Sequence, residues 1–242
     1  MGRWGGSSLT VHVDRRKLVL PGELLAEGRF EAGPNTYREG DKIYSAVVGL
    51  AEIKNKVVSV IALKGCYIPK VGDVVIGVIT DYSPTSWQVD INSPYTATLQ
   101  VVDALPRPID PAKENIRKYF DVGDVIVGEV IVFDKTRNPM LTTKGKGYGK
   151  LTGGRLLEIS PTKVPRLIGR RGSMINMIKK ELGCQVIVGQ NGRVWISAKN
   201  SKYEDIAVKV VRKVEMEAQI PGLTERVRKM IKEEKSRIES GS

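Results

Sequence analysis

The second half of this chain contains the sequence Lys163-Val-Pro-Arg-Leu-Ile-Gly-Arg-Arg-Gly-Ser-Met-Ile-Asn-Met-Ile-Lys-Lys-Glu-Leu182, which indicates how this half folds. Helical segments flank Gly169-Arg170-Arg171-Gly172, and apolar residues recur at helical spacing from Met174 to Leu182. The glycines let the loop backbone approach a ligand closely, and the following helix offers unpaired N–H groups at its positive end. The arginines neutralise phosphate charge and can fork onto phosphate oxygens. The stretch therefore predicts a phosphate-binding loop.

The residues that follow extend this pattern into a domain. Residues 183–188 are predicted to form a strand, Asn191-Gly192 a hairpin turn, residues 193–198 a second strand and residues 203–217 a helix. This order, with the signature Ile168-Gly-x-x-Gly-x-x-Ile175, resembles a type I KH domain. In that family the loop clamps about four nucleotides of a single strand and an apolar groove holds the bases. The resemblance implies an RNA site made of Ile168, Gly169, Arg170, Arg171, Gly172 and Ile175, with Lys163 and Arg166 beside it and Ile187 in the groove.

The alternative for this loop is an ordinary helix–loop–helix corner, in which two glycines three residues apart are common. The apolar residues on both sides and the hairpin signal favour the KH domain.

Composition bounds the class of protein. A chain of 242 residues with 41% hydrophobic content is long enough for two or three small domains. No apolar run approaches the ~18 residues of a membrane span, and no signal peptide opens the chain. We expect a soluble, cytoplasmic protein that does not bind a membrane. Cys66 and Cys184 lack CxxC spacing and are expected to be reduced core residues, not a disulfide or a metal site.

The distribution of charge indicates the partner. The net charge of +12 implies a polyanion. Residues 146–220 hold 15 Lys and Arg against 6 Asp and Glu, a net +9, whereas residues 69–145 hold 8 against 10, a net −2. Most of the positive charge therefore lies in the KH-like segment.

A repeated phrase marks a second domain. Val71-Gly-Asp-Val-Val-Ile-Gly77 recurs as Val122-Gly-Asp-Val-Ile-Val-Gly128, and each Gly-Asp turn starts an apolar strand. Further strands are predicted at residues 87–91, 96–102 and 138–144, with a short helical link at 116–120. Five such strands and one link describe an OB-fold barrel.

The barrel resembles the S1 RNA-binding domain over residues 66–146. By that resemblance Trp87 stacks on a base, and Lys135, Arg137 and Lys144 lie along the RNA backbone. The alternative is that Trp87 fills one end of the barrel.

The flanking segments complete a four-part organisation. Residues 1–65 are predicted to form a small β domain, residues 66–146 the S1 domain, residues 147–220 the KH domain and residues 221–242 a helical extension. The basic, glycine-rich segment 144–150 is predicted to be a hinge. Thr224 is a candidate N-cap for a helix to about Ile238 with an apolar stripe for a domain or a partner.

This domain order, with Pro21-Gly22-Glu23 in the first domain, resembles the S1/KH cap subunits of the archaeal RNA exosome, the ribosomal RNA processing protein four family. The resemblance implies a multidomain α+β protein that binds single-stranded RNA. It also implies a trimeric cap on a hexameric ring of phosphorolytic nuclease subunits, which guides RNA 3′ ends into the pore of a 3′-to-5′ exoribonuclease complex. The first domain would hold the ring.

The sequence also predicts that the chain is not itself an enzyme. His12 is the single histidine, and no nucleophile–base set, metal cluster or cofactor motif is present in the sequence. Two other readings compete with the cap subunit. A fragment of polynucleotide phosphorylase would place KH before S1, and a regulatory adaptor of transcription or translation usually carries two KH domains.

Overall fold

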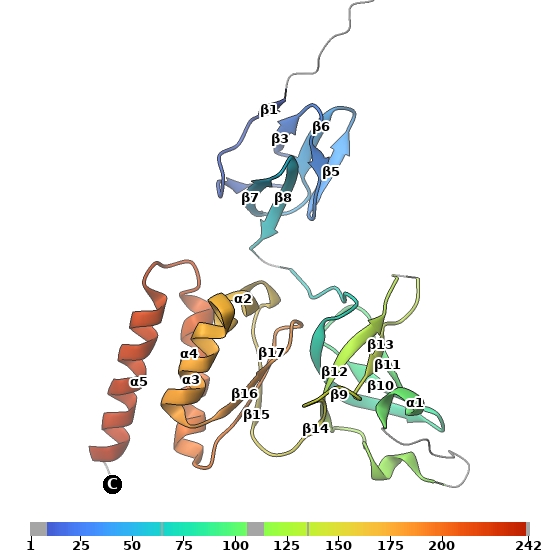
Figure 1. The fold of residues 1–242 in the computed structure, drawn as a ribbon, viewed down its shortest axis with the longest axis vertical. Coiled ribbons are helices and arrows are strands. Elements are labelled where there is room, and N and C mark those ends of the chain that lie inside the picture. The colour runs from blue at the N-terminus through green and yellow to red at the C-terminus, as the bar shows by residue number, and fades with distance from the viewer. Residues whose placement is uncertain (1–8, 64, 106–113, 135, 241–242) are drawn as a thin grey trace, which may run out of the picture. The chain divides into compact units, whose positions relative to one another are not determined.

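The computed structural model describes residues 9–63, 65–105, 114–134 and 136–240. The chain forms two compact units, residues 1–65 and residues 66–242, each with its own core (Figure 1).

The first unit consists of two four-stranded sheets, with strand orders β1-β3-β6-β5 and β2-β7-β8-β4. Its core includes Leu25, Ile43 and Val58, which are fully buried. The strands are β1 (Thr10–Val11), β2 (Leu18–Val19), β3 (Leu24–Glu27), β4 (Glu31–Ala32), β5 (Thr36–Glu39), β6 (Lys42–Ser45), β7 (Gly49–Lys54) and β8 (Val57–Ala62).

The second unit begins with a closed barrel. Its strands follow the order β13-β11-β10-β9-β12, and β12 pairs again with β13 to close the ring, which confirms the five-stranded OB-fold. The predicted link is the short helix η1 (Ile116–Lys118). The strand predicted at 96–102 ends early, because the helix α1 (Val101–Ala104) begins at Val101. The barrel strands are β9 (Val74–Ser83), β10 (Ser86–Asp90), β11 (Ala97–Gln100), β12 (Val125–Val132) and β13 (Met140–Thr142).

The repeated phrase has a structural reason. β9 and β12 are antiparallel neighbours, so the Gly-Asp turn that starts each strand lies beside the far end of the other. Both turns make the same pair of backbone hydrogen bonds across the ladder. These bonds are Gly72 N–H to Val130 O (2.8 Å), Val130 N–H to Asp73 O (2.9 Å), Gly123 N–H to Ile79 O (2.8 Å) and Ile79 N–H to Asp124 O (2.9 Å).

The KH domain follows as a three-stranded antiparallel sheet, in the order β15-β17-β16, covered on one face by helices (Figure 1). The element order βααββα confirms the type I arrangement. Its first strand was not predicted from the sequence. The elements are β15 (Arg155–Glu158), η2 (Pro161–Lys163), α2 (Val164–Ile168), η3 (Arg170–Gly172), α3 (Ser173–Leu182), β16 (Gln185–Val188), β17 (Arg193–Ser197) and α4 (Ser201–Met216).

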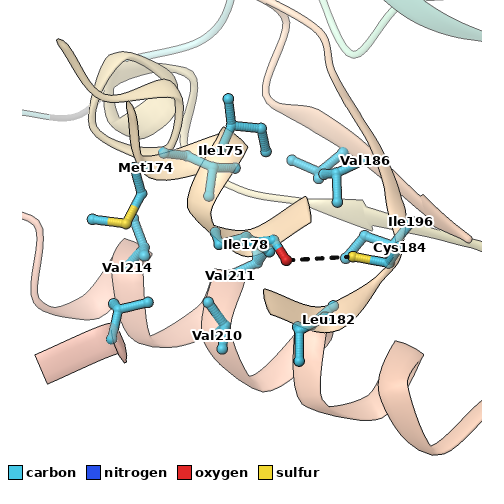
Figure 2. Close-up of a cluster of buried hydrophobic side chains, with 14 of the residues drawn as sticks. Met174, Ile175, Ile178, Leu182, Cys184, Val186, Ile196, Val210, Val211 and Val214 are labelled. Atoms are coloured by element: carbon cyan, nitrogen blue, oxygen red, sulfur yellow. Dashed lines mark hydrogen bonds between the residues drawn. The ribbon is translucent and has the colours of Figure 1, made fainter. Parts of the chain in front are cut away.

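Figure 2 shows the core between α3, α4 and the sheet. Ile178 and Val211 are fully buried there, and the Cys184 thiol lies 3.9 Å from the Ile178 carbonyl oxygen. Burial raises the pKa of that thiol, as is usual for a group whose charged form loses water. Cys66, in contrast, is exposed, so the expectation of a core position is wrong for that cysteine.

The helical extension α5 (Leu223–Ser240) belongs to the same core. Val227 and Ile231 are fully buried against the KH domain, and Met230 packs beside them. The apolar stripe predicted from the sequence therefore packs on a domain of this chain. Thr224 is not the N-cap, because the helix already begins at Leu223.

The segment predicted to be a hinge, residues 144–150, ends in a strand. β14 (Gly149–Leu151) pairs with β12 at the edge of the barrel. The Tyr148 hydroxyl bonds to Glu129 at 3.1 Å, and the Lys150 ammonium bonds to Asp124 at 2.6 Å. The hinge interpretation is wrong, because these contacts fix the segment to the barrel.

Asn191 joins the KH domain to the barrel. Its side chain, in the turn between β16 and β17, is fully buried. The amide nitrogen donates to the carbonyls of Ile76 (2.7 Å) and Ile91 (2.8 Å), and the amide oxygen accepts from the Ile76 N–H at 3.3 Å. The turn therefore completes the hydrogen bonding of barrel backbone groups.

Apolar and charged contacts flank this junction. Trp195 packs with Ile76 and Val127 in a cluster that spans the two domains. The buried guanidinium of Arg193 donates to Asp90 of the barrel and to Glu158 of β15, the latter at 3.0 Å. A buried charge with two carboxylate partners is satisfied where it lies.

Candidate nucleic-acid interface

The loop between α2 and α3 requires glycine. Gly169 ends α2 with φ 76° and ψ 173°, and a Cβ there would lie 2.7 Å from the Met174 backbone nitrogen. Gly172 is left-handed with φ 77°, and Arg171 between them also has a positive φ of 52°. These conformations turn the chain sharply outward. Gly172 N–H then donates to the Gly169 carbonyl at 3.2 Å and closes the turn.

The loop presents positive charge that the protein does not neutralise. Arg170 and Arg171 are exposed, and within the described residues neither side chain has an ion pair or hydrogen bond. Ser173 begins α3 after Gly172, which offers no capping side chain, and the first turn carries no acidic residue. The free N–H groups of a ten-residue helix and two guanidinium groups therefore meet at one corner.

Two further basic residues lie on the helix before the loop. Arg166 is exposed on α2, one turn before Gly169, and Lys163 is half-buried at the N-cap of α2. Arg166 is therefore close to the loop along the helix, whereas Lys163 lies at the opposite end of α2.

The apolar groove differs from the expected one. Ile168 and Ile175 lie on the helical face of the sheet, where Ile175 is 8% exposed. Ile187 lies on the opposite face and packs with the barrel, because side chains alternate along β16. The prediction that Ile187 lines the groove is therefore wrong. Val188, the next residue, lies on the helical face of the sheet.

Trp87 does not offer a stacking face. The side chain is fully buried in the barrel, 5.2 Å from Phe120 in an edge-to-face arrangement, and its indole N–H donates to the Phe120 carbonyl at 2.8 Å. The stacking role is wrong and the barrel-filling alternative is correct.

A different aromatic pair lies at the surface of the barrel. Tyr95 and Phe133, in the loops after β10 and β12, are half-buried and lie edge to face with ring centroids 4.9 Å apart. Arg137 follows in the same loop as Phe133 and is exposed, with Asp134 at 3.5 Å. Lys144 is exposed after β13, and Lys135 lies outside the described residues.

Phe133 was missed by the sequence analysis. The sequence does contain a signal for it, because Phe133 stands where a predicted apolar strand meets a polar loop. Pairing with Tyr95 could not be read from the chain, because the two residues lie in different loops.

Tyr82 occupies the end of β9. It is 39% exposed, and the Arg117 guanidinium lies 5.3 Å from the centre of its ring. Arg117 also forks onto Asp121 with two bonds of 3.0 Å, which lowers the pKa of that carboxyl. This cation is therefore already paired.

The described residues contain no group of three or more His, Cys, Asp or Glu that could hold a metal ion. No helix in that part of the chain is both long and apolar enough for a membrane span.

Comparisons with known proteins cover most of the chain. Three family models match: Exosome RNA binding protein RRP4 N-terminal domain over residues 16–64, RRP4, S1 domain over residues 66–132, and KH domain over residues 154–202.

Relatives and a solved structure match at high identity. The Exosome complex component Rrp4 of Thermococcus kodakarensis is 50% identical over 223 residues, which cover 91% of this chain and 87% of the relative. The protein of the same name from Thermofilum pendens is 45% identical over 94% of this chain and 98% of its own length. A crystal structure described as an exosome complex RNA-binding protein aligns with a TM-score of 0.67 at 44% identity, over 72% of this chain and 99% of that one. The chain belongs to the Rrp4 family of exosome components.

Proposed function

We propose that this protein is a non-catalytic RNA-binding cap subunit of a 3′-to-5′ exoribonuclease complex, the exosome, and works in the cytoplasm. The observation that carries the proposal is the corner where Arg170 and Arg171, unpaired and exposed, lie between two glycines at the start of α3. Phosphate groups of single-stranded RNA fit this corner by charge and by hydrogen bonding.

The barrel supplies a second contact for the same strand. Tyr95 and Phe133 form a half-buried aromatic pair at the surface of the barrel, against which a base can pack. Arg137, in the same loop as Phe133, and Lys144, after β13, are exposed cations for the backbone of the strand. Two contacts on one strand would let the cap hold RNA while its 3′ end is passed to a nuclease. A regulatory adaptor of transcription or translation is not favoured, since models of the Rrp4 N-terminal and S1 domains both match.

The first unit carries a surface suited to a protein partner. Leu18, Leu50 and Ile61 are paired in register across β2, β7 and β8, and Leu18 and Ile61 are 53% and 46% exposed. Leu20 and Val48 are exposed beside this row. Exposed apolar side chains gathered on one sheet face mark a protein interface. We assign this face to a hexameric ring of phosphorolytic nuclease subunits, which three copies of the chain would cap.

The RNA contact is tested by reversing the loop charge. Arg170→Asp with Arg171→Asp keeps both glycines, and aspartate tolerates the left-handed conformation at position 171. Affinity for oligo-A RNA should fall, and the slope of log K against log salt should flatten by roughly 1.4, because each phosphate contact on a single strand contributes about 0.7.

The matched control is Lys229→Glu with Lys232→Glu on the exposed side of α5, which changes the net charge equally. The control should keep the wild-type slope. Neither protein should shorten the RNA with phosphate and Mg²⁺ present. A wild-type slope in the folded loop variant would reject the loop as the RNA contact, and phosphate-dependent shortening would reject the non-catalytic role.

The ring contact is tested separately. Leu18→Asp with Ile61→Asp should abolish co-elution with purified ring subunits, because two carboxylates would have to lose water in the interface. Val11→Asp, which places a charge at an exposed position of the other sheet, is the control. Retained co-elution of the double variant would move the interface elsewhere.

A further inference from the structure

A cleft of about 610 Å³ lies between the edge strand of the barrel and the face of the KH sheet opposite the helices. One wall is formed by Lys150, Leu151 and Thr152 of β14 and the residue after it. The floor is formed by β16 and β17, and Lys199 lies at one end. The glycine loop does not line this cleft, so it is a separate place on the molecule.

The floor contains one apolar cross-strand pair of residues and, beside it, one polar pair. Ile187 pairs directly with Trp195, and two residues away on the same face Gln185 pairs with Ser197. The Trp195 indole N–H donates to the Gly153 carbonyl at 2.9 Å, which fixes the ring in the floor. Trp195 itself is only 6% exposed, so the half-buried Ile187 provides the apolar surface of the floor, next to an amide and a hydroxyl.

The polar side chains of the cleft are available to a ligand. Among the described residues, those of Thr152, Gln185, Ser197 and Lys199 have no hydrogen bond or ion pair within the protein. Lys150 is paired with Asp124, so Lys199 is the lining cation that no acid neutralises. The eleven lining residues include two lysines and no acidic residue. The charge of the cleft thus favours an anion.

We propose that this cleft binds one nucleoside phosphate unit. Its base would lie against Ile187, with its polar edge toward Gln185 and Ser197 and its phosphate toward Lys199. A primary amide offers both a donor and an acceptor, as the edges of bases require. The volume is within the range of about 300 to 1,000 Å³ that small-ligand sites occupy at domain junctions.

This chemistry has two sources, an RNA strand or a free nucleotide. Binding of a strand rests on the proposed function, whereas binding of a free nucleotide does not. A strand bound at both the glycine loop and the cleft would contact opposite faces of the KH sheet.

The test follows backbone amide resonances of the full chain during titration with AMP and, separately, with oligo-A RNA. Gln185, Ile187 and Ser197 should shift with at least one of the two probes. Shifts with RNA alone identify the strand as the source, and shifts with AMP also identify a free nucleotide. If neither probe moves these amides, the cleft is not a nucleotide site, even when the loop residues 169–172 respond to RNA.

A charge variant separates the cleft from the loop. Lys199→Glu should weaken binding of the shifting probe at least about threefold and flatten the salt slope for RNA by about 0.7, the value for one phosphate contact. Lys202→Glu, an equal change at an exposed position of α4 that does not line the cleft, should leave both unchanged. Equal behaviour of the two variants would overturn the proposal. Failure of wild-type protein to bind RNA at all would instead reject the proposed function.

Discussion

Gly169 sets the shape of the loop between α2 and α3. The Cβ of any other residue would meet the backbone nitrogen and the Cβ of Met174, at 2.7 and 2.8 Å, and neither atom can move without shifting α3. At Gly172 the nearest obstacle is the Asn176 side chain at 3.3 Å, which can rotate away. The two glycines of the motif are therefore not equivalent.

We predict that Gly169→Ala destabilises the start of α3 by more than Gly172→Ala does. The second change costs about 1–2 kcal/mol, the penalty for an alanine in left-handed conformation. The first adds the steric clash. Hydrogen exchange of the α3 amides in the full chain measures both, with Gly172→Asn as the control, since asparagine tolerates that conformation better. Equal protection in the two alanine variants would contradict the prediction.

Trp87 shows the limit of sequence reasoning for a single residue. Alternation along β10 predicts that Trp87 and Val89 share a face, and both are fully buried. The face of β10 that points into the barrel depends on how the barrel closes between β12 and β13. That pairing is made by residues far from β10 in the sequence. The identity of the strand was therefore predictable, and the direction of its tryptophan was not.

Among the elements, α5 has more structural importance than its terminal position suggests. It packs along α4 and α3, and Glu217, at the end of α4, bonds to Lys213 at 2.8 Å and to Arg226 of α5 at 2.7 Å. These partners lower the pKa of Glu217. A lowered carboxyl pKa contributes stability above the ordinary glutamate range of about 4.3, which is lost as the pH falls through the folded-state value.

We predict that Ile231→Ala destabilises the KH core by about 2–5 kcal/mol, the usual cost of emptying a buried isoleucine site. Lys229→Ala, on the exposed side of the same helix, should cost no more than about 0.5 kcal/mol. Hydrogen exchange of Ile178 and Val211 amides reports on this core directly. Unchanged exchange in the Ile231 variant would mean that α5 is an appendage to a core that is stable without it.

Elements with strong local periodicity were predicted well, and those defined by distant partners were not. Residues 173–182 carry a helical stripe, and the helix found there has those bounds. β14 and β15 have three and four residues, and they exist because β12 and β17 pair with them. The glycine-rich sequence around β14 resembled a flexible linker, since its pairing partners lie 22 to 26 residues earlier in the chain.

In the second unit of the chain, the Asn191 turn joins the barrel to the KH domain. We predict that Asn191→Ala loosens this junction, because two barrel carbonyls and one N–H would lose their partner in a buried place, at about 1–3 kcal/mol for each unsatisfied group. Residual dipolar couplings of the full chain should fit one alignment tensor for both domains in the wild type and two in the variant.

Gln190→Ala is the control for the junction, because the side chain at that position is exposed and the backbone N–H that bonds to Val74 is kept. It should retain a single tensor. A single tensor in the Asn191 variant as well would show that the apolar cluster of Ile76, Val127 and Trp195 is sufficient to join the domains.

The Asn191 turn should also limit the exchange of the barrel or the KH domain between relatives. A chimera joining the barrel of one relative to the KH domain of another at residue 150 would place a foreign turn against residues 74–76 and 91. We expect such an exchange to succeed when both sides of the junction are transferred together. For recombination, residues 66–242 would then count as one unit, although their sequence contains two separately recognisable domains.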